Sequence, residues 1–227
     1  MNTGMATPAQ PRVSAGENST LLDRADLMYC LARAFLPPPE GWSVCDWAQP
    51  LEDDLMELGA STGLPTGAVQ AALDAECSRW AGAARLADGS ADSWLVEYTR
   101  LFLMPPVLAP LNTGLYLEGS VGGTAAQMMR SCYETAGAAP DDDFHDLPDH
   151  VAMQLEFVAR LLERGARGDA DGVAMAEEFC REFVHAWAGP LQQACESAAQ
   201  LHPAARVYVE LTRLLRAAVH DPALASA

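Results

Sequence analysis

The sequence contains no lysine, so its 14 basic residues are all arginines, against 31 acidic residues and a formal net charge of −17 at pH 7. A surface with this charge repels phosphate backbones and anionic lipid headgroups, which disfavours nucleic acids and membranes as partners. The Walker A motif is excluded as well, because it uses a lysine to reach the nucleotide phosphates. An acidic surface attracts basic ligands, although a charge that serves solubility alone is the simpler explanation.

Long apolar runs and signal-like segments are also missing. No stretch of 18 or more apolar residues is present, which argues against a transmembrane helix. Residues 1–18 are small, polar and rich in proline and glycine, and they lack the basic and apolar regions of a secretory signal. We expect this segment to be a disordered tail, residues 223–227 to be a short C-terminal tail, and the protein to be cytoplasmic.

Cysteine pairs of the CxxC type are absent, although the chain has six cysteines. Several of them fall on apolar helix faces, as Cys180 does beside Phe179 and Phe183. This pattern predicts buried free thiols in a reducing compartment, rather than a disulfide framework or a zinc site.

Period-two alternation and internal repeats are absent, whereas apolar residues recur at helical spacing along most of the chain. We therefore predict an all-α fold, a single globular bundle of about eight to nine helices over residues 19–222. The predicted helices cover residues 20–36, 50–59, 66–81, 92–103, 123–137, 149–164, 170–188 with a continuation to 199, and 204–219.

Three signals set the predicted boundaries of these helices. Thr20 and Asp23 have the spacing of a capping box, which places a helix start near residue 20. The prolines at 37–39 end that helix, and Gly189-Pro190 predicts a break in a later one. Residues 103–123 hold three prolines and four glycines in a mostly apolar setting, which predicts a packed, hinge-like loop (about 104–122) that covers a groove.

An acidic stretch precedes the predicted helix at 149–164. Its carboxylates and imidazoles could ligate a cation, but the glycine and terminal glutamate of a calcium loop are missing, as is an HExxH motif. Asp149 could instead cap the helix. Alternatively, Asp149 and His150 could offer an acceptor and a donor to a guest backbone or guanidinium. The residues alone leave these readings open for Asp141, Asp142, Asp143, His145, Asp146, Asp149 and His150.

Several motifs, in this order, resemble the TorD/DmsD family of cytoplasmic chaperones for molybdenum-containing redox enzymes. The resemblance covers about residues 20–220. It rests on "EYTRLFLMPP" (97–106), a Pro/Gly loop that ends at "LYLEG", the helix "LPDHVAMQLEFV" (147–158), and "FVHAWAGPLQQA" followed by "YVELTRLLRA".

The resemblance implies a non-catalytic maturation factor without a cofactor or metal of its own. Such a protein binds the twin-arginine leader or the apoprotein of a molybdoenzyme catalytic subunit and delays export until the cofactor is inserted. The residues that we expect to bind the client are Tyr98, Leu101, Phe102, Tyr116, Glu118, Asp146, Asp149, His150, Gln154 and Glu156.

The chain departs from the family pattern at two places. Residues 113–116 read Thr-Gly-Leu-Tyr where relatives often have a Glu-Ser-Val-Tyr-like stretch, so Tyr116 is kept and Glu118 could supply the acid. Gln154 stands where a glutamate is usual, while Glu156 is retained.

Two alternatives remain beside the leader-binding chaperone. One is a helical metalloprotein or enzyme centred on the acidic loop 141–150. The other is an assembly adaptor for a reductase subunit that has no leader. The hinge-like loop also allows either a monomer or a domain-swapped dimer.

Overall fold

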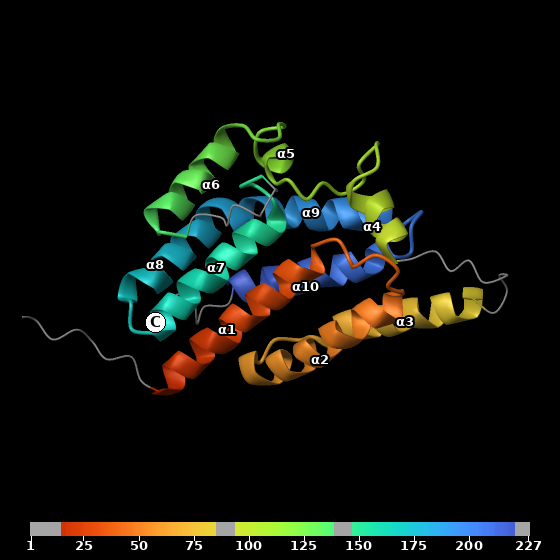
Figure 1. Cartoon of the computed structure of the whole chain (residues 1–227), viewed down its shortest axis with the longest axis horizontal. Helices are drawn as coiled ribbons and strands as arrows, with labels where there is room; N and C mark the ends of the chain where they lie inside the picture. The colour runs from red at the N-terminus through yellow and green to blue at the C-terminus, as the bar shows by residue number, and fades with distance from the viewer. Residues whose placement is uncertain (1–14, 85–93, 139–146, 221–227) are drawn as a thin grey trace, which may run out of the picture.

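Helices make up about 75% of the described structure, a computed structural model that places residues 15–84, 94–138 and 147–220 (Figure 1). No strand is present in these ranges, so the predicted all-α class is confirmed. The elements are α1 (Ala15–Ala34), α2 (Val44–Thr62), α3 (Gly67–Ala84), α4 (Trp94–Phe102), α5 (Gly114–Leu117), α6 (Thr124–Thr135), α7 (Val151–Ala166), α8 (Ala170–Phe179), a π turn η1 (Cys180–Val184), α9 (His185–Ala198) and α10 (Ala205–His220).

Helix α7 lies at the centre of the bundle. It packs along α1 on one side and against α8 on another, while α10 packs on α9 and α3. The α2–α3 pair lies along one side of the molecule, and α5 and α6 lie at the opposite side (Figure 1). The polar side chains of α7, apart from buried Gln154, lie on one stripe that includes Glu156, Arg160 and Glu163. Twelve of its 16 residues are buried, as expected for a helix that others enclose over most of its surface.

Two groups of aromatic rings fill the core. At one end, Tyr208 of α10 is completely buried, and four rings surround it at centroid distances of 4.6–6.1 Å. At the other end, the Phe157 ring of α7 contacts Tyr133 of α6 at 4.7 Å and Phe179 of α8 at 4.9 Å. Contacts of this kind add about 0.5–1.5 kcal/mol per pair beyond area burial. The rings around Tyr208 are Phe35, Trp47, Trp94 and Phe102.

The first helix begins earlier than predicted. It starts at Ala15, and the Thr20 hydroxyl donates to the Gly16 carbonyl at 3.1 Å, so Thr20 lies inside the helix and does not cap it. Residues 15–18 are therefore helical rather than part of a disordered tail, while residues 1–14 lie outside the described structure. The helix ends at Ala34, just before the three prolines, as expected.

The second helix also begins before its predicted start. Its N-cap is Ser43, whose hydroxyl accepts from the Asp46 N–H, while the Asp46 carboxylate accepts from the Ser43 N–H at 2.9 Å. This reciprocal capping box sets the start at Val44. Pro50, taken as the first helical residue, lies inside the helix on its exposed face.

The predicted break at Gly189-Pro190 is wrong. Helix α9 runs through both residues, and the irregular turn is the π turn η1, which ends just before α9 begins. Pro190 is exposed and removes only one backbone hydrogen bond. Trp187 and Leu191 beside it are fully buried, and their packing keeps the helix continuous.

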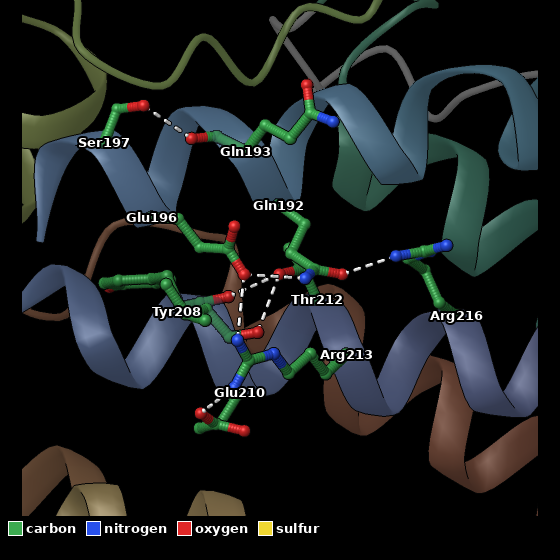
Figure 2. A network of polar contacts seen from close by, with 10 residues as sticks. Gln192, Gln193, Glu196, Ser197, Tyr208, Glu210, Thr212, Arg213 and Arg216 are labelled. Carbon is green, nitrogen blue, oxygen red and sulfur yellow. Dashed lines mark hydrogen bonds and ion pairs between the residues drawn. The ribbon is translucent and has the colours of Figure 1, made fainter.

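Exposed ion pairs cover the seam between α9 and α10 (Figure 2). Arg213 of α10 bonds Glu210 on the same helix at 2.7 Å and Glu196 of α9 at 2.8 Å. Arg216 donates to the side-chain carbonyl of Gln192 at 2.7 Å. Because these groups are solvated, each pair contributes about 0–1 kcal/mol, and burial of the apolar faces holds the two helices together.

The six cysteines are all free thiols, as predicted. Cys30, Cys180 and Cys195 are buried, whereas Cys45 is exposed. Burial raises the pKa of each of the three buried thiols to about 12, which keeps them protonated and unreactive. None of the helices in the described ranges combines the length and the apolar character needed to cross a bilayer.

Candidate functional site

The segment between α4 and α6, residues 103–123, has two parts with different surroundings. Its first part presents Leu103, Met104 and Val107 to solvent, with exposed fractions of 56%, 53% and 38%. Pro105 and Pro106 between them are exposed as well and are joined by a cis peptide bond. This cluster, which we call the apolar tip (residues 103–107), is an uncommon concentration of exposed apolar side chains, a feature typical of interaction surfaces.

The second part of the segment is fixed by Asp149. The Asp149 side chain is completely buried, and its carboxylate accepts from the Gly114 N–H at 3.0 Å and from the Asn112 amide at 3.3 Å. Its backbone carbonyl accepts from the Thr113 N–H at 2.8 Å and from the Thr113 hydroxyl at 3.0 Å. A buried carboxylate needs such donors to offset its desolvation. Asp149 therefore clamps residues 112–114 onto the start of α7.

Gly114 is required at this clamp by space. A Cβ atom there would lie 2.7 Å from the Asp149 carboxylate and 2.5 Å from the Ser120 carbonyl oxygen. Its backbone N–H can approach the buried carboxylate only because it has no side chain.

His150, and not Asp149, is the N-cap of α7. Its Nδ1 accepts from the Ala152 N–H at 3.2 Å, and its side chain is almost buried. An acceptor at Nδ1 requires a neutral ring that carries its proton on Nε2. The histidine therefore caps the helix as a neutral acceptor, which resolves the conflict that a cation would have with the helix dipole.

Gln154 links the clamp to the rest of the core. It is completely buried, and its Nε2 donates to the Thr113 hydroxyl at 2.7 Å and to the Asp149 carbonyl at 3.0 Å. Its Oε1 accepts from the Trp187 indole N–H at 2.8 Å. A glutamate, the residue usual in the resembling family, could accept from Trp187 but could not donate to the other two oxygens when ionised.

Two further bonds hold residues 147–151 in place. The Tyr133 hydroxyl of α6 donates to the Pro148 carbonyl at 2.7 Å, and the Val151 N–H donates to the Leu111 carbonyl at 2.9 Å. The clamp thus joins α6, α7, α9 and the segment before α5.

Tyr98, Leu101 and Phe102 lie beneath the apolar tip, in the core. All three are buried, the Tyr98 hydroxyl donates to the Phe35 carbonyl at 2.9 Å, and Phe102 meets Tyr208 edge on. The Leu101 carbonyl accepts the N–H groups that follow the tip, from residues 108 and 109. These residues support the tip from below.

Tyr116 and Glu118 have separate surroundings on the far side of the clamp. The Tyr116 hydroxyl is buried and finds no hydrogen-bond partner among the described residues, and burial raises its pKa. The Glu118 carboxylate accepts from the Ala125 N–H at 3.1 Å and so caps α6, whose N-cap Gly123 has no side chain to do so. A Cβ on Gly123 would overlap that carboxylate.

Glu156 lies on another face of α7 from the clamp. It is half-buried. Burial raises the pKa of its carboxyl, and Arg160 lowers that pKa in part. Glu156 also raises the pKa of Tyr29 on α1, whereas Arg160 lowers it. Asp146 lies outside the described residues together with the rest of the acidic stretch 141–145. Within the ranges that are described, no group of three or more His, Cys, Asp or Glu side chains is arranged to hold a metal ion.

A family model decides the relationship of this chain to known proteins. The model of the nitrate reductase delta subunit matches residues 66–193, which is more than half of the 227-residue chain. The protein belongs to the nitrate reductase delta subunit family. This family comprises chaperones for nitrate reductase-type molybdoenzymes, so the resemblance to TorD/DmsD-type maturation proteins is confirmed. Searches of curated proteins and of solved structures return no match.

The match to the delta subunit family covers the apolar tip, the whole clamp and most of α9. Several clamp residues were not among the expected site residues: Asn112, Thr113, Gly114, Tyr133 and Trp187. Thr113 could have been found from the sequence, because it lies in residues 113–116, where the chain departs from the pattern of the resembling family. Trp187 looked like an ordinary core residue, because nothing in its helical spacing shows that its indole N–H is bonded to Gln154.

Proposed function

We propose that this protein is a cytoplasmic chaperone that binds the catalytic subunit of a nitrate reductase-type molybdoenzyme, through its leader or its apoprotein, before the molybdenum cofactor is inserted. The match to the delta subunit family carries this proposal. The chaperone acts by binding and not by catalysis. Export of a client with a leader would be delayed for as long as the leader is held.

The apolar tip is the contact surface that we assign to the client. Leu103, Met104 and Val107 are exposed on a segment whose base is fixed by the clamp. A fixed base lowers the entropy that the loop loses on binding, and methionine adapts to apolar partners of different shape. Asp149, His150, Gln154, Tyr98, Leu101 and Phe102 would then affect binding by holding the tip in position.

Affinity purification tests the proposal. The tagged protein, isolated from the cells that produce it, should enrich a molybdoenzyme catalytic subunit, identified by mass spectrometry and lacking its cofactor. The double variant Leu103→Ser, Met104→Ser should capture much less of it. Leu201→Ser is the matched control, because Leu201 is 82% exposed in the turn between α9 and α10, outside the family match. Failure of the wild-type protein to enrich any molybdoenzyme subunit contradicts the proposal.

A truncated client distinguishes a leader-binding chaperone from an adaptor that binds the body of the subunit. If the client without its N-terminal leader is no longer captured, the leader is the binding element. Undiminished capture of the truncated client shows instead that the chaperone holds the folded body.

A further inference from the structure

A second surface, away from the apolar tip, combines a pocket with two carboxylates. The pocket lies between α6, α7 and the α8–η1 segment and has a volume of about 310 Å³. Pockets that bind small ligands start at about this volume, and a pocket of this volume can hold one or two side chains of a bound peptide. Its lining residues are Ser131, Cys132, Thr135, Phe157, Met175, Glu178, Phe179 and Glu182.

The floor of the pocket is apolar and aromatic. Phe157 and Phe179 are buried and meet edge to face at 4.9 Å, and half-buried Met175 lies beside them. Cys132, Glu178 and Glu182 line the same pocket; burial raises the pKa of the Cys132 thiol, and the two carboxylates raise it further.

Glu178 and Glu182 are exposed at the pocket and have no ion-pair partner among the described residues. Glu196 and Glu210, by contrast, are both paired with Arg213 on the other side of α9 (Figure 2). With 31 acidic residues and 14 arginines, many carboxylates must remain unpaired, so the lack of a partner is not distinctive by itself. The apolar pocket beside them is what distinguishes these two glutamates.

The backbone between the two glutamates is irregular. Glu178 belongs to α8 and Glu182 to the π turn η1, which is the only π segment in the described ranges. π turns are rare and occur frequently at functional sites. The two glutamates are four residues apart, a spacing that brings side chains to one helix face, and both line the pocket.

We propose that this pocket binds a peptide segment in which an arginine stands next to apolar residues. The guanidinium lies between Glu178 and Glu182, and the neighbouring apolar side chain lies on Phe157, Phe179 and Met175. Aromatic faces also favour a guanidinium by cation–π attraction. The inference rests on the proposed function, because it names the chemistry of a client segment, and it places that segment at a site separate from the apolar tip.

Two short peptides test the pocket directly. Ala-Arg-Leu-Phe-Ala is titrated into the full-length protein labelled with ¹³C at its methionine methyl groups, and Ala-Gln-Leu-Phe-Ala serves as the uncharged comparison. The Met175 resonance, assigned with Met175→Leu, should shift with the arginine peptide at about ten-fold lower concentration than with the glutamine peptide. Equal responses, or none at the Met175 signal, overturn the proposal.

Variants separate the charge from the shape of the pocket. The double variant Glu178→Gln, Glu182→Gln should lose the preference for arginine and keep the weak binding of the glutamine peptide. Glu134→Gln is the matched control: it removes the same charge from exposed Glu134 of α6, which does not line the pocket, and should change nothing. Ser131→Trp, at an exposed lining position, should block both peptides. An arginine preference that survives in the double glutamine variant also overturns the proposal.

The outcome for the pocket is distinguishable from the outcome for the chaperone function. If the wild-type protein and the double glutamine variant capture the molybdoenzyme subunit equally, and the peptide preference is absent, the pocket fails and the chaperone function stands. Loss of the subunit from the wild-type capture contradicts the chaperone function, whichever peptide the pocket prefers.

Discussion

The two parts of the segment between α4 and α6 differ in what their residues contribute. Residues 112–114 bind Asp149 and Gln154 through side-chain and backbone groups of all three residues. Thr113 and Gly114 are buried and Asn112 is half-buried. The apolar tip, a few residues earlier, exposes three large apolar side chains. The polar and charged residues therefore build the buried support, whereas apolar residues that belong to no recognisable motif form the exposed surface. We conclude that residues 112–114 are tuned for stability and the apolar tip for contact.

The comparison predicts that removal of the Asp149 carboxylate has the largest effect. Asp149→Ala leaves the buried Gly114 N–H without an acceptor and should lower the free energy of unfolding by about 3 kcal/mol. Urea denaturation followed by circular dichroism measures this loss. Asp74→Ala, which removes an exposed aspartate from α3, should change the stability by less than about 0.5 kcal/mol. A small loss for Asp149→Ala would contradict the structural role of the clamp.

The sequence predicted the helical fold well because helix periodicity is a local property. The apolar stripes of α7 and α10, and the end of α1 at three prolines, could be read within windows of a few turns. Boundaries were wrong where a stronger local signal was overlooked. Ser43 with Asp46 starts α2, and this capping box lies seven residues before the predicted start at residue 50.

The site was harder to predict because it depends on contacts between distant residues. Asp149 and His150 were identified as important, but the sequence could not show that their side chains point into the protein. The partners of the Asp149 carboxylate are 35 and 37 residues away, and Trp187 is 33 residues from Gln154. The path of the loops brings these residues together, and neither the hydrophobic periodicity nor any sequence motif predicts these contacts.

The close approach at Gly114 allows a test with two glycines. Gly114→Ala should lower the free energy of unfolding by about 2 kcal/mol, because the new methyl group must displace the Asp149 carboxylate or the Ser120 carbonyl. Gly82→Ala is the matched change in α3, where a Cβ meets nothing within 4 Å and no proline follows. It should raise the stability by about 0.5–1 kcal/mol, since alanine favours a helix interior over glycine. Thermal denaturation measures the change in stability of each variant. A loss for Gly114→Ala together with a gain for the control variant supports the clamp geometry, and changes of the same sign contradict it.

Gln154→Glu tests the departure from the family pattern. The variant should lose about 1–2 kcal/mol at pH 8, because an ionised carboxylate cannot donate to Thr113 or to the Asp149 carbonyl. Burial beside these oxygens should raise the folded-state pKa of the new carboxyl above its unfolded value. The neutral acid is then the form that the fold accepts, so stability is highest below the unfolded pKa and falls as pH rises through the folded pKa.

Unfolding measured from pH 4 to pH 8 checks this sign. The wild-type protein supplies the baseline, so the quantity compared is the difference between variant and wild type at each pH. A difference that does not grow between pH 5 and pH 8 would show that the added carboxyl is solvated or has found new donors.

The apolar tip should respond in the opposite manner to the clamp. Leu103→Ser with Met104→Ser removes exposed side chains that fill no cavity, so the free energy of unfolding should change by less than about 0.5 kcal/mol. Capture of the client subunit should nevertheless fall. Gly114→Ala, in molecules that remain folded, should weaken capture as well, because the tip loses its fixed base. A tip variant that unfolds as readily as a clamp variant would show that the two parts share one structural role. Together, the two measurements separate a residue that touches the client from one that positions it.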